Sequence, residues 1–200
     1  MLAERLSSIN GTVLEGPLLL SPRVFGDARG FFFESWNQRA FAAALEADGQ
    51  TSPGFVQDNH SRSSRGVLRG LHYQLPPSPQ AKLVRCVLGE IFDVAVDVRR
   101  SSPSFGQWVG ARLSADRHQQ LWVPAGFAHG FLSLNEYAEV LYKTTDFWSQ
   151  PCERAIRWDD PALAIAWPAE GLPEGQPLLA DKDGKAPTLA DAVAAGDVFP

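Results

Sequence analysis

The sequence LVRCVLGEIFDVAVDV occupies residues 83–98 and is typical of β-structure. From Ile91 to Val98, bulky apolar residues alternate with small or acidic ones, which is the period of a strand with one buried face. Leu83–Leu88 precedes this strand and is predicted to be its hairpin partner across Gly89 and Glu90. These residues predict antiparallel β-structure in the middle of the chain.

On both sides of this region, short apolar runs recur between Gly, Pro, Ser and Asn residues. They predict strands over residues 107–113, 120–123, 130–134 and 139–144. Many short strands at such spacing indicate a sandwich or a barrel. One helix is expected over Gln38–Glu46, capped by Asn37 or Ser35 and ended by Gly49.

The C-terminal third changes character, because prolines at positions 161, 168, 173 and 177 interrupt it and few strand patterns remain. It is expected to wrap the barrel as loops and short helices. The chain has no internal repeat and no glycine-rich phosphate-binding motif, so a Rossmann or nucleotide-hydrolase fold has no support. A length of 200 residues fits a single domain spanning residues 1–200.

Composition excludes several function classes. The chain is 44% hydrophobic and 20% charged with a net charge of -5, and no run of Lys or Arg is long enough to follow a nucleic-acid backbone. No segment has the length of a signal sequence core or a membrane span. Cys86 and Cys152 lie far apart without CxxC spacing, which argues against a zinc site or a disulfide framework. The expectation is a cytoplasmic protein that binds neither nucleic acid nor membrane.

Two of the four histidines lie in dense polar and aromatic surroundings: His72 within residues 69–74, and His129 within residues 124–130. Strand alternation would direct each imidazole to one face, while neighbouring glycines allow a close approach of backbone or ligand. The alternative is a core histidine paired with a backbone carbonyl. Arg69 and Lys82 favour a functional site at His72, because a purely structural core seldom collects cations.

The pattern Pro124-x-Gly126-x-x-His129 resembles the second sequence motif of cupins, and Gly70-Leu71-His72 stands where the first motif belongs. This resemblance implies an all-β fold, the double-stranded β-helix or jelly-roll barrel, with a few short peripheral helices. Metal-binding cupins have a second histidine where this chain has Gln74, and no glutamate follows before Glu90. Too few ligands remain for a stable zinc or iron site, so no catalytic metal is predicted.

Five further stretches are similar to dTDP-4-dehydrorhamnose 3,5-epimerases, in the same order and over nearly the whole chain: residues 27–34, 57–61, 66–74, 92–97 and 141–145. The resemblance implies inversion of C3 and C5 of dTDP-4-dehydro-6-deoxy-D-glucose, giving dTDP-4-dehydro-L-rhamnose on the route to activated L-rhamnose. Both carbons lie beside the C4 ketone, so a base, an acid and donors for an enolate suffice. No cofactor is expected.

The same resemblance assigns roles to individual residues. His72 corresponds to the proton acceptor and Tyr142 to the proton donor on the opposite face, while Lys82 would hold the enolate oxygen. Asp183, in the stretch 180–183, corresponds to the carboxylate that orients the histidine, although residues 171–177 before it are longer than usual. A buried aromatic in the core is the alternative for Tyr142.

Further matched positions suit a nucleotide sugar. Cationic groups for pyrophosphate or sugar oxygens are expected at Arg29, Arg69 and Lys182, and hydrogen-bond partners at Glu34, Gln57, Asp58, Asn59, His129 and Glu153. Trp148 stands where the family often has a tyrosine that stacks on thymine, and an indole offers a larger face. For Glu34, Asp58 and Glu153 the alternative is a solvated surface charge.

Three other functions remain open: an epimerase acting at C3 or C5 only, a non-catalytic cupin that binds a nucleotide sugar, and a metal-dependent cupin oxygenase or isomerase. The resemblance also implies a homodimer in which an N-terminal strand crosses to the partner's sheet. Residues 12–20 are the expected strand, and pairing there would cover an open sheet edge.

Overall fold

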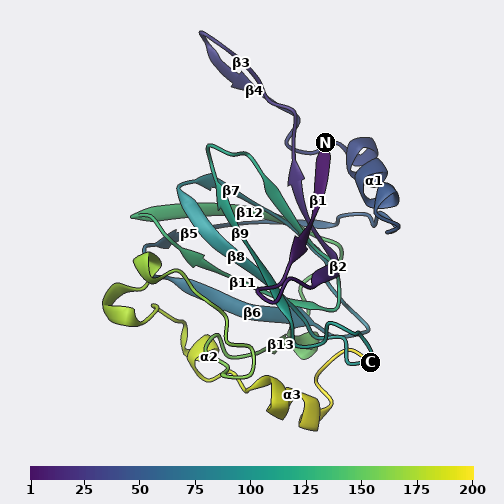
Figure 1. Ribbon diagram of the computed structural model, residues 1–200, viewed down its shortest axis with the longest axis vertical. Coiled ribbons are helices and arrows are strands. Elements are labelled where there is room, and N and C mark those ends of the chain that lie inside the picture. The colour runs from purple at the N-terminus through teal and green to yellow at the C-terminus, as the bar shows by residue number, and fades with distance from the viewer.

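The computed structural model describes residues 1–200 and shows two antiparallel sheets that face each other as a jelly-roll barrel, with a small hairpin standing away from them (Figure 1). The six-stranded sheet has the order β1 (Leu2–Ser7), β2 (Val13–Ser21), β10 (Gln120–Val123), β7 (Lys82–Leu88), β12 (Tyr137–Thr144) and β5 (Gln57–Ser64). The five-stranded sheet has the order β13 (Glu153–Ala155), β6 (Leu68–Gln74), β11 (Phe127–Ser133), β8 (Glu90–Asp97) and β9 (Trp108–Ser114). The fold class predicted from the sequence is confirmed.

The three largest hydrophobic clusters hold this arrangement together. The first lies between the sheets and includes Val84, Ile91 and Phe127. The second lies on the outer side of the five-stranded sheet, where the C-terminal segment covers it, and the third lies between the six-stranded sheet and helix α1 (Gln38–Ala47). The barrel is therefore covered on both outer faces, over part of their area, by helix α1 on one side and by the C-terminal segment on the other.

The strands predicted around residues 83–98 exist, but their predicted pairing is wrong. β7 lies in the six-stranded sheet between β10 and β12, whereas β8 lies in the five-stranded sheet between β11 and β9. At Gly89 the chain passes from one sheet to the other, with φ +71° and a position where a Cβ would lie 2.3 Å from the Tyr137 carbonyl oxygen. This crowded corner, rather than a hairpin turn, explains the glycine.

Strand β8 also differs from the expected strand with one buried face. The residues Val94, Val96 and Val98 pack under the C-terminal segment, while Ile91 and Ala95 on the other side face the inter-sheet core. Both faces are buried because the C-terminal segment covers the outer one. The face with small and acidic residues is thus the barrel interior.

Helix α1 begins where the sequence predicted it. The Asn37 side chain accepts a hydrogen bond from the Ala40 N–H at 3.1 Å, so Asn37 rather than Ser35 is the cap. The helix ends with Asp48 at its C-cap, directly before Gly49. No helix in the chain combines the length and the apolarity that crossing a membrane requires.

The C-terminal segment wraps the five-stranded sheet with short elements, as predicted (yellow-green and yellow in Figure 1). It contains the 3-10 turns η1 (Gln150–Cys152), η2 (Ala169–Gly171) and η3 (Pro173–Gly175) and the helices α2 (Asp181–Gly184) and α3 (Leu189–Ala195). Residue Leu178 is tied to the start of β6, because its N–H donates to the Gly66 carbonyl at 2.7 Å and its carbonyl accepts from the Leu68 N–H at 3.0 Å.

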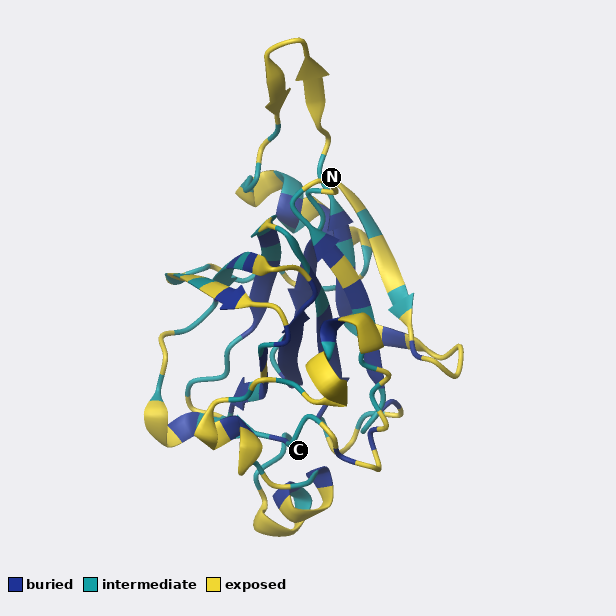
Figure 2. Cartoon of the chain, turned by 90° about the vertical axis from the view of Figure 1, so that its left-hand side faces the viewer, coloured by how far each residue is buried: buried dark blue, intermediate teal, exposed yellow.

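The N-terminal region supplies both an inner strand and an exposed hairpin. Residues 12–20 lie largely in β2, whose two edges are already paired within the chain to β1 and β10. On this side of the sheet the edge strand is therefore β1. Strands β3 (Phe25–Asp27) and β4 (Gly30–Phe32) form the hairpin that projects beyond the barrel, exposed along its whole length (Figure 2).

Candidate active site

A cavity of about 520 Å³ opens between the two sheets at the end of the barrel where β5, β6, β11 and β12 meet the C-terminal segment. It brings together nine of the residues predicted from the sequence: Arg69, His72, Lys82, His129, Tyr142, Trp148, Glu153, Lys182 and Asp183. The remaining lining residues are Ser61, Val67, Leu68, Phe131, Leu178, Leu179 and Ala180.

A bulge in β6 lets both Arg69 and His72 reach this cavity. They are three positions apart, so a regular strand would direct them to opposite faces. The register shifts, however, because two residues, Gly70 and Leu71, lie opposite one residue of β11, Gly130. A Cβ on Gly70 would lie 2.5 Å from the Gly130 Cα atom, so the two backbones can approach this closely only as glycines.

His72 is held by a carboxylate from the far end of the sequence. Its Nε2 lies 2.6 Å from Asp183 Oδ1, and the Gly70 N–H donates to Asp183 Oδ2 at 3.4 Å. Asp183 is 2% exposed and His72 23% exposed, so the imidazole bridges a buried anion and the open cavity. Burial would raise the pKa of Asp183, but the hydrogen bond and charge of His72 outweigh it and lower that pKa below its ordinary value.

Lys82 crosses from the six-stranded sheet to the five-stranded one. Its buried Nζ donates to the His72 carbonyl at 3.1 Å, which fixes the ammonium beside the strand that carries the imidazole. Burial lowers the pKa of Lys82 to about 8, while the charges of Asp93 and Glu153 act in the opposite direction. The ammonium is therefore poorly solvated and available to a developing anion.

Tyr142 approaches the cavity from the other side. It lies on β12 of the six-stranded sheet, paired with Asn59 and Val84, whereas His72 lies on β6 of the facing sheet. Burial raises the pKa of Tyr142, with the Arg69 charge acting against this, so the phenol keeps its proton at neutral pH. A base and an acid thus reach one cavity from opposite walls.

His129 forms a second histidine–carboxylate pair beside the first. It lies directly across the ladder from His72, and its Nε2 is 2.7 Å from Asp93 Oδ1. Burial lowers the pKa of His129 and outweighs the opposing effect of Asp93, so this ring is neutral at pH 7. Asp93 Oδ2 is buried without a hydrogen-bond partner.

The cavity is cationic although the protein is acidic. Three basic side chains, Arg69, Lys82 and Lys182, face two carboxylates, Glu153 and Asp183. Lys182 Nζ pairs with Glu153 at 3.0 Å. Arg69 Nε donates to the Ser63 hydroxyl at 3.0 Å, which directs the guanidinium into the site. An anionic ligand fits this lining better than the net charge of the chain suggests.

Two predicted binding residues lie away from the cavity. Arg29 is at the tip of the β3–β4 hairpin, where it pairs with Asp27, and its side chain is almost fully exposed. Glu34 follows the hairpin and accepts a hydrogen bond from the Asn37 amide at 3.0 Å. Neither is among the residues that line the cavity of His72 within this chain.

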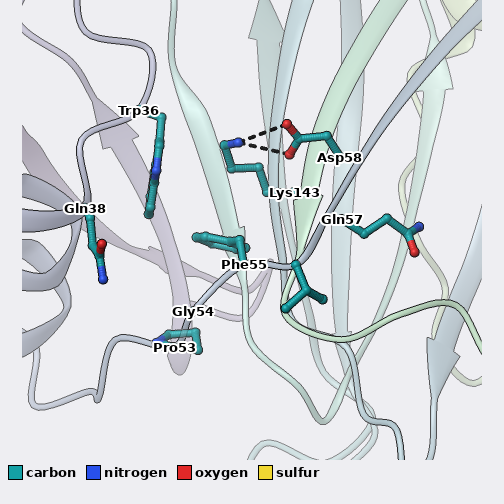
Figure 3. A pocket seen from close by; sticks show the side chains of 9 residues that line it. Trp36, Gln38, Pro53, Gly54, Phe55, Gln57, Asp58 and Lys143 are labelled. Carbon is teal, nitrogen blue, oxygen red and sulfur yellow. Dashed lines mark hydrogen bonds and ion pairs between the residues drawn. The ribbon is translucent and has the colours of Figure 1, made fainter.

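The predicted residues on β5 divide between two faces. Gln57 and Asn59 lie on the inner side, joined by a 3.0 Å hydrogen bond, and Gln57 Oε1 accepts from the Trp148 N–H at 3.2 Å. Asp58 lies on the outer side, because strand residues alternate, and pairs with Lys143 at 2.9 Å. Figure 3 shows this pair in a separate hollow of about 420 Å³, with Gln57 pointing away from it. Asp58 therefore lies outside the cavity of His72 within this chain, and its role in substrate binding stays a prediction.

Sequence reasoning missed several members of the site. Ser61 has the same strand parity as Gln57 and Asn59, so alternation along β5 was a signal for it. Asp93 is an acidic residue on the interior face of β8. It could be recognised from the sequence only if that face were already known to lie inside the barrel. Nothing in the sequence marks residues 178–180 as a cavity wall. No group of three or more His, Cys, Asp or Glu side chains is arranged to bind a metal ion.

Comparison with known proteins agrees with this geometry. A sequence model of the dTDP-4-dehydrorhamnose 3,5-epimerase family matches residues 11–191. The dTDP-4-dehydrorhamnose 3,5-epimerase of Pseudomonas aeruginosa is 62% identical over 183 residues, covering 92% of this chain and 94% of that protein.

Solved structures agree as well. The dTDP-6-deoxy-D-glucose-3,5-epimerase of Legionella pneumophila in complex with dTDP-4-keto-L-rhamnose has a TM-score of 0.85 and 42% identity, over 99% of this chain and 98% of that one. A 3'-monoepimerase of Streptomyces bikiniensis in complex with dTDP-quinovose has a TM-score of 0.82 and 37% identity, over 92% and 89% of the two chains. Sequence and structure agree along nearly the whole length, and the chain belongs to the dTDP-4-dehydrorhamnose 3,5-epimerase family.

Proposed function

We propose that this protein is a dTDP-4-dehydrorhamnose 3,5-epimerase, which inverts C3 and C5 of dTDP-4-dehydro-6-deoxy-D-glucose and forms dTDP-4-dehydro-L-rhamnose for dTDP-L-rhamnose biosynthesis. The observation that carries the proposal is the cavity in which His72, backed by Asp183, faces Tyr142 from the opposite sheet. Inversion of a carbon beside a ketone requires such an arrangement, because the proton leaves on one face and returns on the other.

His72 acts as the base. Asp183 is ionised at neutral pH and can only accept hydrogen bonds, so the Nε2 of His72 carries the proton that it shares with Asp183 Oδ1. The free lone pair is then on Nδ1, which takes the proton from the sugar carbon. The buried carboxylate stabilises the imidazolium that forms.

The electrons of the broken C–H bond move onto the C4 oxygen and form an enolate. Lys82 stabilises this oxygen as a desolvated ammonium beside His72. Tyr142 then donates its phenolic proton to the same carbon from the opposite face, which inverts the centre. Tyr142 regains a proton from solvent, and the His72 imidazolium releases the abstracted proton to solvent, so both groups return to their starting state. The same set acts a second time at the other carbon, and the proposal requires no metal and no redox cofactor.

Substrate recognition follows from the charge of the cavity and its aromatic rim. Arg69 and Lys182 suit the diphosphate and sugar oxygens, and the neutral ring of His129 suits a sugar hydroxyl or the C4 oxygen. The ring of Trp148 offers a face on which thymine can stack. Gln57, Asn59 and Glu153 supply further hydrogen-bond partners around this rim.

A mono-epimerase acting at one carbon is the second candidate function. The structural similarity to the 3'-monoepimerase of Streptomyces bikiniensis supports this second candidate, because that protein has the same fold over most of this chain. We associate the choice between single and double epimerisation with Trp148. A ring bulkier than that of tyrosine limits how far the bound sugar turns between the two proton transfers.

The proposal includes a homodimer in a reducing compartment such as the cytoplasm. Phe25 and Phe32 are exposed on the projecting hairpin, and a second copy of the chain is the partner that would cover them. The same hairpin carries Arg29. Both cysteines are buried and unpaired, which suits a reducing environment.

The test is deuterium incorporation from heavy water into dTDP-4-dehydro-6-deoxy-D-glucose by chelator-treated protein, followed at C3 and C5. Label at both carbons, at the same rate with and without chelator and abolished in His72→Ala, is the expected result. Label at one carbon only would make the protein a mono-epimerase. Absence of label at both carbons in the wild-type protein would refute the proposal and leave a binding protein.

A further inference from the structure

The buried amide of Gln74 contacts a loop that the catalytic proposal uses only through Trp148. Gln74 lies on β6 two residues beyond His72, is 3% exposed, and does not line the cavity. Its Nε2 donates to the Ser78 carbonyl at 2.7 Å and to the Phe147 carbonyl at 3.2 Å. Its Oε1 accepts from the Ser149 N–H at 2.7 Å. Both amide hydrogens and the amide oxygen are thus engaged with backbone.

These contacts bracket Trp148. The Phe147 carbonyl immediately precedes this residue and the Ser149 N–H immediately follows it, and its own N–H donates to Gln57 Oε1 at 3.2 Å. Three consecutive residues of the loop are therefore held through their backbones by two glutamines on β6 and β5. The indole itself is 57% exposed at the mouth of the cavity. These contacts fix the backbone immediately before, at and after the residue that carries the ring.

We propose that Gln74 is a positioning residue that holds Trp148 in its stacking orientation and ties it to the strand that carries His72. Gln74 thereby determines affinity for substrates with an aromatic base, and acts through Trp148 without touching the sugar. The inference rests on the proposed function, because it takes a dTDP-sugar as the ligand.

The energetic reason is preorganisation. An exposed aromatic side chain that is free to change its orientation must lose conformational freedom when a base stacks on it, which weakens binding. Gln74 imposes that order before the ligand arrives. An apolar residue at position 74 would leave the Phe147 carbonyl and the Ser149 N–H without their buried partner, so the loop would relax toward water.

The experiment compares Gln74→Leu and Gln74→Glu with the wild-type protein, using binding of dTDP by calorimetry and steady-state kinetics of deuterium incorporation. We expect Kd for dTDP and KM for the dTDP-sugar to rise about tenfold, the equivalent of one lost hydrogen bond, with kcat changed less than about twofold. Gln74→Glu retains the acceptor for the Ser149 N–H but repels two carbonyl oxygens, so it weakens binding as well. The Gln74→Glu variant also provides the test if Gln74→Leu does not fold.

A double-mutant cycle separates positioning from general stability. In a Trp148→Ala background, Gln74→Leu is expected to weaken dTDP binding no further, because its effect passes through the missing ring. The matched control is Gln50→Leu. The side-chain amide of Gln50 also makes three hydrogen bonds, with the Gly16 carbonyl, the Asp48 carboxylate and the Trp122 indole. It lies outside the cavity. It is expected to lower the melting temperature without changing Kd.

Three results would overturn the inference: additive effects of the two substitutions, a fall in kcat with KM unchanged, or a rise in Kd in Gln50→Leu equal to that in Gln74→Leu. None of the binding measurements depends on turnover. Failure of the epimerase proposal therefore appears in the wild-type exchange assay, and failure of the positioning role in the dTDP cycle.

Discussion

The pair of His72 and Asp183 sets the reactivity of the site at the level of single residues. Asp183→Asn is nearly isosteric, but its amide can donate to Nε2, which would move the imidazole proton to Nδ1 and remove the free lone pair. We expect kcat to fall on the order of 10³- to 10⁴-fold, comparable with the effect of a wrong histidine tautomer elsewhere. His72→Ala should lose about 10²- to 10⁴-fold.

The control for this pair is Asp159→Asn, which removes a surface carboxylate bonded to Arg157 and should leave kcat unchanged. Kinetics of deuterium incorporation measure all three variants. If Asp183→Asn retained more than about a tenth of the wild-type kcat, the tautomer argument would fail and Asp183 would be a folding residue only.

The lowered pKa of Lys82 predicts that the rate falls on the alkaline side of the pH–rate profile. Its pKa is lowered to about 8 by burial, so the ammonium that stabilises the enolate is charged below this pH and neutral above it. The rate should therefore fall as pH rises through about 8, while Tyr142, whose pKa burial raises, still holds its proton.

The measurement is kcat/KM against pH for wild type and Lys82→Gln. The variant should be slower at neutral pH and should lack the limb near pH 8. A wild-type rate that stays flat to pH 9 would contradict this role, as would an unchanged limb in Lys82→Gln. Circular dichroism at each pH excludes unfolding as the cause.

Prediction of neighbouring cavity residues from the sequence was possible where the signal was local. His72, Arg69 and Lys82 lie within 14 positions of one another, and cations collected around a histidine already indicated a site. Asp183 is 111 positions away from His72, so only resemblance to a family pointed to it. Asp93 was missed because its pairing with His129 depends on which face of β8 is interior, and the alternation of that strand does not reveal this.

At the scale of elements, the bulge between β6 and β11 decides which side chains share the cavity. A Cβ on Gly130 would lie 2.7 Å from the Arg69 carbonyl oxygen, and Gly130 has no positive φ, so Gly130→Ala tests close approach alone. We expect a loss of about 1–3 kcal/mol in the free energy of unfolding, from overpacking. The exchange rate should also drop, because Arg69 and His72 move.

Gly54→Ala is the matched control, because a Cβ there meets nothing within 4 Å and the backbone is also without positive φ. Its stability and activity should equal those of the wild type. Chemical denaturation and the exchange assay provide both readouts. A Gly130→Ala protein with wild-type stability would show that the bulge accommodates a methyl group and is not the constraint described here.

Element prediction from sequence found most strands but not their partners. Apolar patterns report burial, and those of β7 and β8 each indicate a strand, yet the ladder is set by long-range contacts that the pattern does not encode. The tight turn at Gly89 resembled a hairpin because corners between sheets use the same residue types. The C-terminal segment was correctly expected to wrap the barrel, while its short helices carry too little periodic signal to locate.

At the scale of the whole molecule, the hairpin of β3 and β4 is the part that the single chain leaves unexplained. Phe32 is 68% exposed and faces Phe25 across the hairpin, on an arm that extends beyond the barrel (Figure 1 and Figure 2). In a homodimer this arm would reach the neighbouring chain. Phe32→Asp should therefore convert a dimer to a monomer in light scattering, whereas Ile9→Asp, at a residue 72% exposed in the β1–β2 turn, should not.

The same arrangement predicts complementation between two inactive chains. Arg29 lies on the arm and away from the cavity of its own chain, so in a dimer it would serve the partner's site. We expect Arg29→Ala to weaken substrate binding and His72→Ala to abolish exchange. A mixture of the two, allowed to exchange subunits, contains heterodimers in which one site has both residues intact. Its activity should exceed the sum of the separate activities. Activity equal to that sum, with subunit exchange verified by mass spectrometry, would show that Arg29 does not act on the partner's site.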